Sequence, residues 1–375
     1  MKGTILKQIL RISAVTLALA SAALAQTATP STPTTTSPKA PATTPATTPA
    51  NTPATTPAIT PQSASKPAAK QTPLRLQSLA PESLADPFPP VNPKLFTAAS
   101  PTGAEAEAYL HAVLGYDIDR IWRVEAIQTT AAQGVSKVTA LVSERKPNAK
   151  VSRAIFYVLP DGKHLLAEGA GVLPFAADPY ADMRKLLAAR ANGPSMGAVA
   201  KELEFVEFTD LQCPHCKEAE PTMKRLAADY PNAHIVIQNY PIADLHPFAV
   251  RAAAYGLCVA KSNDKAYFVF ASAVYETQAA LTDATGVQTL KDAATKAGAD
   301  PVAIATCAAT PETKAAVDAS IQLAKDAGVD QTPTLYVNGR ALPVGGVPYE
   351  TLKQVIDFQA QLDGVHVRRE MPSLR

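Results

Sequence analysis

The sequence has little excess charge, no long apolar run and few cysteines. Its 375 residues contain 35 Lys and Arg against 33 Asp and Glu, a formal net charge of +2 at pH 7. This near-neutral balance, without a basic stripe, gives no argument for a nucleic-acid partner. No apolar run reaches the roughly 18 residues that a membrane-spanning helix needs. The sequence therefore argues against an integral membrane enzyme.

Only four cysteines are present, and only Cys213 and Cys216 lie close together. A structural zinc site needs about four ligands. Cys258 and Cys307 are isolated in the sequence, so they do not complete such a set. We therefore expect neither a metal ion nor an organic cofactor.

The first 25 residues have the pattern of an export signal. Lysines and an arginine precede a short apolar stretch over 12–24, which ends in the small-residue cleavage motif Ala23-Leu24-Ala25. An uncleaved anchor or a buried helix is the alternative interpretation. The pattern predicts a cleaved signal peptide over 1–25. It also predicts a periplasmic or otherwise extracytoplasmic location, where disulfides can form and persist.

Residues 26–102 are predicted to be a Pro/Thr/Ala-rich disordered linker. Up to about Pro73 the composition is mainly Thr, Pro, Ala and Ser, with a recurring Pro-Ala-Thr-Thr. Such a segment has too few apolar side chains to offset the loss of chain entropy on folding. We expect folded structure to begin near Gly103.

A small α+β module is predicted over 103–175, followed by a linker helix within 176–200. Its helix is expected over 104–115, and a turn at Pro160-Asp161-Gly162-Lys163 predicts a hairpin. The predicted strands cover 122–130, 135–142, 153–159 and 164–168. The module contains no nucleophile–base pair, so assembly or partner contact is the expected role.

The chemistry is expected at Cys213-Pro214-His215-Cys216. This motif follows a predicted strand over 203–209 and precedes a predicted helix over 217–230. The arrangement places the first cysteine at a helix N-terminus, where free N–H groups and the helix dipole stabilise a thiolate. His215 can add positive charge or a hydrogen bond. A purely structural Cys213–Cys216 bond would close a very small loop and gain little stability.

The stretch from Phe208 to Lys217 (FTDLQCPHCK) resembles the active site of the DsbA-like branch of the thioredoxin superfamily. The resemblance extends over about 203–360. Gln331-Thr332-Pro333-Thr334 is similar to the superfamily's cis-proline loop, which packs against the active-site disulfide. The resemblance implies that Pro333 is cis and that Thr332 and Pro333 bind an extended client segment.

The resemblance also implies the fold class. We expect an α/β thioredoxin fold over 201–375 with an inserted helical domain at about 245–327, preceded by the small α+β domain. Cys258 and Cys307 both fall in this insertion. In an oxidising compartment two remaining cysteines most simply pair with each other. A structural disulfide is therefore expected, with two buried free thiols as the alternative.

Glu207 lies six residues before Cys213. DsbA-like proteins commonly place a buried acid there, which implies a role in proton transfer for Glu207. Alternation puts Leu203, Phe205 and Glu207 on one strand face, and Val206 and Phe208 on the other. This pattern favours a central buried strand, which would raise the pKa of the carboxyl group. An ordinary exposed strand carboxylate is the alternative.

The layout of the chain also resembles disulfide isomerases of the DsbC and DsbG type, which dimerise through an N-terminal module. A homodimer through 103–175 is thus one expectation. The predicted activity is protein thiol–disulfide exchange on reduced or misoxidised clients, with Cys213 as nucleophile and Cys216 completing the exchange. An oxidase with a membrane redox partner is the first expectation. A dimeric isomerase or reductase and a chaperone-like client binder are the alternatives.

Overall fold

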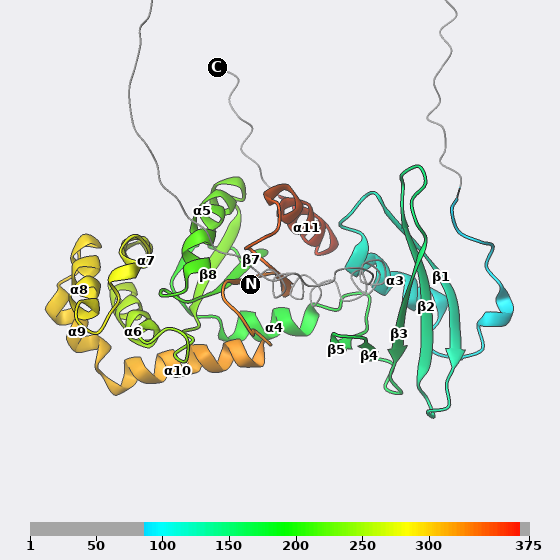
Figure 1. Cartoon of the computed structure of the whole chain (residues 1–375), viewed down its shortest axis with the longest axis horizontal. Coiled ribbons are helices and arrows are strands. Elements are labelled where there is room, and N and C mark those ends of the chain that lie inside the picture. The colour runs from blue at the N-terminus through cyan, green and yellow to red at the C-terminus, as the bar shows by residue number, and fades with distance from the viewer. Residues whose placement is uncertain (1–85, 368–375) are drawn as a thin grey trace, which may run out of the picture. The chain divides into compact units, whose positions relative to one another are not determined.

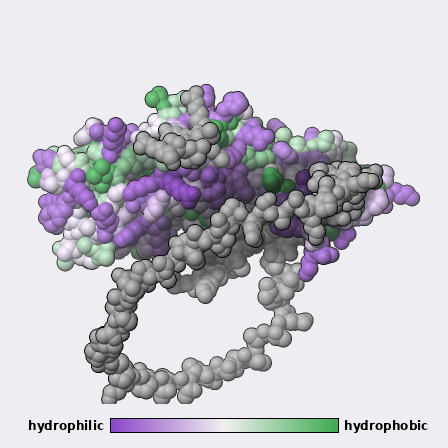
Figure 2. Space-filling model, turned by 90° about the horizontal axis from the view of Figure 1, so that it is seen from above, coloured by the Kyte–Doolittle hydropathy of each residue, from purple (hydrophilic) through white to green (hydrophobic). Residues whose placement is uncertain are grey.

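The computed structural model describes residues 86–367 (Figure 1). The predicted signal peptide and residues 26–85 of the predicted linker lie outside the described residues. Within 86–367 the strands form two five-stranded sheets, one from residues 120–174 and the other from residues 195–342. On the face shown in Figure 2, hydrophilic and apolar residues are interspersed. No helix among the described residues has the length and hydropathy needed to cross a bilayer.

The first sheet is an antiparallel meander in the order β1-β2-β3-β4-β5. Its strands are β1 (Arg120–Thr129), β2 (Ser136–Glu144), β3 (Ser152–Val158), β4 (His164–Ala167) and β5 (Gly171–Pro174). Strand β3 alternates exposed and buried residues, as expected for a sheet with one packed face. The four predicted strands are present. The short fifth strand was not predicted, because two of its four residues, Gly171 and Pro174, disfavour strands.

One helix covers the packed face of this sheet. Helix α3 (Gly103–Leu114) begins with a capping box, in which Thr102 and Glu105 bond each other's backbone N–H groups. Its Tyr109 and Leu110 belong to the same buried cluster as Phe156 of β3. The segment just before the helix also belongs to the module, because Phe96 forms a bridge to Ile127. Folded structure therefore begins before Gly103, earlier than the composition of the linker indicates.

The second sheet is mixed, with the order β10-β9-β7-β8-β6. Its strands are β6 (Ser195–Gly197), β7 (Leu203–Thr209), β8 (Ala233–Asn239), β9 (Thr334–Val337) and β10 (Arg340–Leu342). Central strand β7 runs parallel to β8 and antiparallel to β9. All seven residues of β7 are buried, as its apolar residues Leu203, Phe205, Val206 and Phe208 predict. Glu204 and Glu207, one on each face, are buried with them.

Helices cover both faces of this sheet (Figure 1). Phe205 packs with α5 (Pro214–Asp229) and α11 (Tyr349–Leu362). Phe208, on the opposite face, packs with α4 (Ala181–Arg190) and α10 (Pro311–Asp326). The predicted fold class is confirmed: a thioredoxin fold with a helical insertion, preceded by a small α+β domain.

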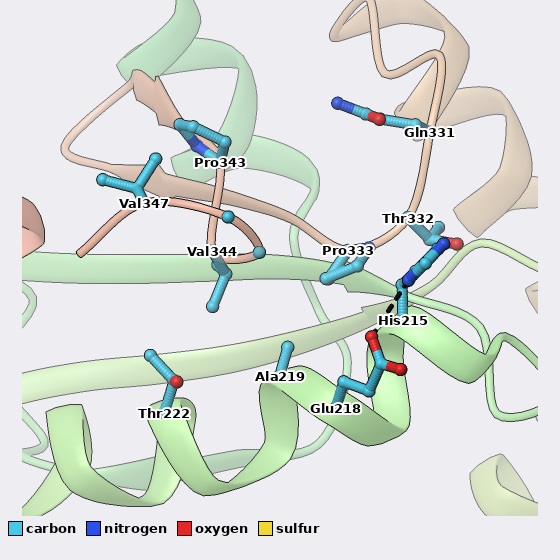
Figure 3. Close-up of a pocket in the computed structure, with 12 residues that line it drawn as sticks. His215, Glu218, Ala219, Thr222, Gln331, Thr332, Pro333, Pro343, Val344 and Val347 are labelled. Atoms are coloured by element: carbon cyan, nitrogen blue, oxygen red, sulfur yellow. Dashed lines mark hydrogen bonds and ion pairs between the residues drawn. The ribbon is translucent and has the colours of Figure 1, made fainter. Parts of the chain in front are cut away.

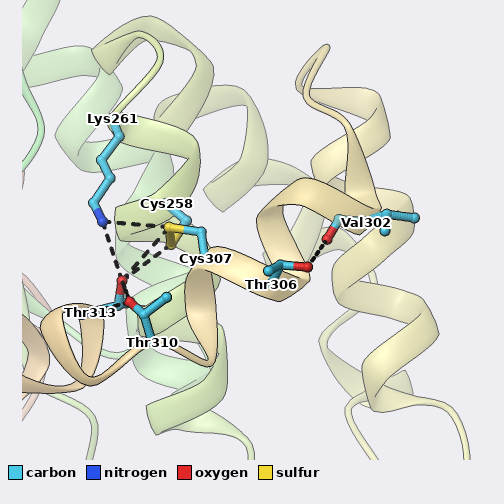
Figure 4. Close-up of a disulfide and its surroundings, with 7 residues drawn as sticks. All are labelled: Cys258, Lys261, Val302, Thr306, Cys307, Thr310 and Thr313. Atoms are coloured by element: carbon cyan, nitrogen blue, oxygen red, sulfur yellow. Dashed lines mark hydrogen bonds between the residues drawn. A yellow bond between two sulfur atoms is a disulfide. The ribbon is translucent and has the colours of Figure 1, made fainter.

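The insertion consists of helices between β8 and β9. It contains α6 (Ala249–Ala260), α7 (Asp264–Glu276), η3 (Gln278–Ala280), α8 (Gly286–Lys296) and α9 (Pro301–Ala308), and α10 leads back to the sheet. A disulfide between Cys258 and Cys307 joins α6 to α9 (Figure 4). Lys261 and Thr313 lie beside its sulfur atoms, and the Thr313 hydroxyl is 3.5 Å from Cys258 Sγ. The disulfide closes a separation of 49 residues, long enough to constrain the unfolded chain.

Arg340 connects the α+β module to the thioredoxin-like part of the chain. Its guanidinium donates to the carbonyl oxygens of Ala112 and Val113, at 3.2 and 2.8 Å. These carbonyls belong to the last turn of α3, whose C-terminal oxygens have no partner inside the helix. The rings of Tyr180 and Phe358 lie within 5.9 Å of the same guanidinium carbon. Arg340 is only 4% exposed, so this contact is part of the interior.

Candidate active site

Cys213 and Cys216, the two cysteines of the predicted site, lie at the start of helix α5. Cys213 is the N-cap residue and Pro214 is the first helical residue, a position that suits proline because its missing N–H would have no partner there. The helix begins three residues before the predicted start at Lys217. No disulfide joins Cys213 and Cys216 in this structure, and the two residues are 5% and 1% exposed. Cys213 is thus the more accessible of the two.

The pKa of the Cys213 thiol is lowered to about 5. The largest cause is a hydrogen bond from the Cys216 thiol, and backbone N–H groups of Cys216 and His215 add to it. The side chain of Thr332 acts in the same direction, while burial opposes them. Burial raises the pKa of Cys216 well above its usual value, and the neighbouring Cys213 raises it further. The pair therefore has one stabilised thiolate and one thiol that keeps its proton.

His215 contributes to this site through its backbone. Its imidazole Nδ1 lies 3.1 Å from Glu218 Oε2 on the exposed side of α5 (Figure 3). The contribution of His215 to the lowered pKa of Cys213 comes from its N–H group. The ring forms part of the rim of a neighbouring groove.

That groove lies between α5 and the loop that contains Pro333. The Thr332–Pro333 peptide bond is cis. The Thr332 carbonyl oxygen is 3.6 Å from Cys213 Sγ. The groove encloses about 440 Å³, and Figure 3 shows Ala219 and Val344 facing it from opposite sides. A peptide segment placed along this loop would have the Cys213 sulfur at its edge.

Glu207 lies on the other side of the cysteine pair. Its carboxyl group and Cys216 line a cavity of about 190 Å³, together with Glu220, Tyr267 and Tyr275. Glu207 is 6% exposed. Burial raises its pKa to about 7, and the charge of Glu220 adds to this effect. The structure thus places a carboxyl group that titrates near neutral pH in the cavity behind Cys216.

The raised pKa predicts how a reduced Glu207→Gln variant behaves. A folded-state pKa of about 7 means that the folded protein holds this proton to a higher pH than the unfolded chain, where the pKa is about 4.3. The free energy of unfolding of the wild type should therefore decrease as the pH rises from about 4.3 to about 7. The variant has no carboxyl group at this position and should not show this decrease. Above about pH 7 the variant should be more stable than the wild type by about 3 kcal/mol.

Urea unfolding with reductant present, at about pH 5 and about pH 8, measures this difference. The gap between variant and wild type should be several-fold larger at the higher pH. A gap that is equal at the two pH values would contradict a buried carboxyl group that titrates near 7.

Several polar residues that hold the active-site loop were not predicted. Asp210 is fully buried and bonds to His246, and the Gln278 amide donates to the carbonyl oxygens of Leu211 and Cys213. These partners come from the insertion, far away in the sequence. The only sequence signal for Asp210, His246 and Gln278 is that their side chains are polar. Within residues 86–367, no group of three or more His, Cys, Asp or Glu is arranged to hold a metal ion.

The comparisons with known proteins concern the second part of the chain. A family model described as Thioredoxin matches residues 190–358. The curated Na(+)/H(+) antiporter NhaA 1 of Salinispora arenicola is 29% identical over 143 residues, which cover 38% of this chain and 19% of the antiporter. The chain thus spans about a fifth of the length of this curated relative.

Two solved structures are similar over about half of the chain. Proteus mirabilis ScsC in a transitional conformation is 24% identical, with a TM-score of 0.41 over 49% of this chain and 82% of ScsC. A thioredoxin-like oxidoreductase from Silicibacter pomeroyi is 26% identical, with a TM-score of 0.41 over 48% of this chain and 98% of that one. The family match shows that residues 190–358 form a thioredoxin-like domain. Two cysteines lie beside a cis-proline within it.

Proposed function

We propose that this protein is an exported oxidase that introduces disulfides into reduced client proteins. The observation that carries the proposal is the position of Cys213 at the N-terminus of α5, beside Cys216 and the cis Thr332–Pro333 bond. The lowered pKa of Cys213, about 5, agrees with this geometry. A stabilised thiolate favours the reduced form of the pair, so the disulfide form is a stronger oxidant. The proposed extracytoplasmic location rests on the export-signal pattern over 1–25.

The proposed reaction has two exchange steps. A client thiolate attacks Cys213 Sγ of the Cys213–Cys216 disulfide, and Cys216 leaves as a thiolate that takes up a proton. A second client thiolate then attacks the client sulfur of the mixed disulfide, and Cys213 leaves as a thiolate. The client loses two electrons and the cysteine pair gains them. A membrane redox partner would then reoxidise the pair.

Other residues have supporting roles in this proposal. Glu207 would exchange the proton of Cys216, because both groups line one cavity. Thr332 and Pro333 would align an extended client segment beside Cys213. His215 would supply its N–H group to the Cys213 thiolate. The module over 103–175 would contact a partner or a second copy of the chain.

The reduction potential of the Cys213–Cys216 pair, measured in glutathione buffers, tests the proposal. We expect a value near −120 mV, where strongly oxidising proteins lie. A value of about −180 mV or lower would contradict the oxidase and favour an isomerase or reductase. A Cys213→Ala/Cys216→Ala double variant that still suppresses client aggregation as wild type does would favour a chaperone-like binder.

A further inference from the structure

The carboxylate of Asp210 is the centre of a buried polar cluster beside the resolving cysteine. Its Oδ1 accepts from the Gln212 N–H at 2.8 Å, and its Oδ2 accepts from the Ile242 N–H at 2.9 Å. His246 Nδ1 lies 2.8 Å from the same Oδ2. The Asp210 side chain is 0% exposed and that of His246 is 17% exposed. Three donors therefore fix the orientation of this residue.

The backbone of Asp210 faces the sulfur atom of Cys216. Its N–H points at Cys216 Sγ, with a nitrogen–sulfur distance of 3.4 Å. Such a donor stabilises a thiolate more than a thiol or a disulfide sulfur, because hydrogen bonds to charged groups are stronger. The direction of this N–H depends on the peptide unit before Asp210, and hence on how Asp210 is held.

We propose that His246 is a positioning residue for Cys216: it holds Asp210 so that the Asp210 N–H donates to the Cys216 sulfur during exchange. His246 lies in the turn between β8 and α6, so the helical insertion would act on the resolving cysteine through this contact. The inference deepens the proposed thiol–disulfide exchange. It applies to the oxidase and the isomerase alike, because both use Cys216.

The step concerned can be isolated with glutathione disulfide as oxidant. The Cys213 thiolate of the reduced protein attacks one sulfur of glutathione disulfide, which forms a mixed disulfide and releases one glutathione thiolate. The Cys216 thiolate then attacks Cys213 Sγ and releases the second glutathione thiolate. Two protein thiols are oxidised and one glutathione disulfide is reduced. Acid quenching and mass spectrometry of the full chain follow the adduct in time.

A His246→Phe variant keeps a ring of similar size without the donor to Asp210. We expect the second step to slow by about three- to tenfold, because without this hydrogen bond a smaller fraction of Cys216 is present as thiolate. A thiolate of higher pKa is a stronger nucleophile, but this gain compensates only in part. The first step, attack by Cys213, should change by less than about twofold. His246→Asn can place an amide donor near Asp210 and should restore most of the second-step rate.

His234→Phe is the matched control. His234 Nδ1 also makes a 2.8 Å contact, to the Ala198 carbonyl oxygen, and lies near the start of β8 away from the cysteines. This variant should lose a comparable contact and keep both rates. If His246→Phe does not fold, His246→Leu is compared with His234→Leu instead.

Equal second-step rates in the His246 and His234 variants would overturn the positioning role. So would a loss of rate that His246→Asn does not relieve. A wild-type protein that forms no glutathione adduct would instead contradict the proposed exchange function, so the two failures are distinguishable.

Discussion

A Cys213→Ser variant should lose disulfide transfer to a reduced dithiol peptide by more than about a thousandfold. Cys213 is the more accessible cysteine of the pair and lies beside the Thr332 carbonyl oxygen. Its pKa is lowered to about 5, so it is the cysteine that forms the thiolate. A serine hydroxyl forms no disulfide, and the buried Cys216 is not placed to receive the client. Single-turnover oxidation of the peptide, followed by mass spectrometry, measures the loss.

The matched variant is Cys216→Ser, which leaves Cys213 in place. It should still attack a disulfide probe but should accumulate the mixed disulfide, because nothing releases it from within the protein. A Cys213→Ser protein that retained more than a few per cent of the wild-type rate would contradict the assignment of the nucleophile. Accumulation of adduct on Cys213→Ser rather than on Cys216→Ser would reverse the two roles.

The strand–cysteine-pair–helix arrangement around Cys213 and Cys216 could be predicted from sequence because its signals are local. The apolar strand over 203–209, the Cys-x-x-Cys and the following helix lie within a short stretch, and the structure has them in this order. Helix α5 nevertheless begins at Pro214 rather than at Lys217, since a proline suits the first helical position. Strand β8 was not predicted, although Ile235, Val236 and Ile237 form a short β-branched apolar run that is typical of a buried strand.

What the sequence could not indicate are contacts between distant elements. Asp210 and His246 are 36 residues apart, and neither residue type predicts burial. The contacts of Arg340 likewise depend on the tight turn at Asn338-Gly339, where both residues have positive φ, and on the end of a helix over 200 residues away. Such pairs form only when the sheet and its helices have assembled.

Loss of Arg340 should strongly destabilise the fold. It donates to two carbonyl oxygens at the end of α3 and lies among the rings of Tyr116, Tyr180 and Phe358. An Arg340→Met variant keeps the apolar stem but leaves both carbonyl oxygens buried without a donor. Each such loss costs about 1.5–3 kcal/mol when the donor is charged, so we expect the free energy of unfolding to fall by about 4 kcal/mol.

Urea unfolding of the full chain measures this effect, with Arg190→Met as the control. Arg190 pairs with Asp326 on the surface, where its side chain is 39% exposed, and such pairs contribute about 0–1 kcal/mol. Because Arg340 links α3 to β10, its loss should also separate unfolding of the α+β module from that of the thioredoxin-like domain. If Arg340→Met unfolds in a single transition whose urea midpoint is lowered no more than that of Arg190→Met, other contacts hold the α+β module and the thioredoxin-like domain together.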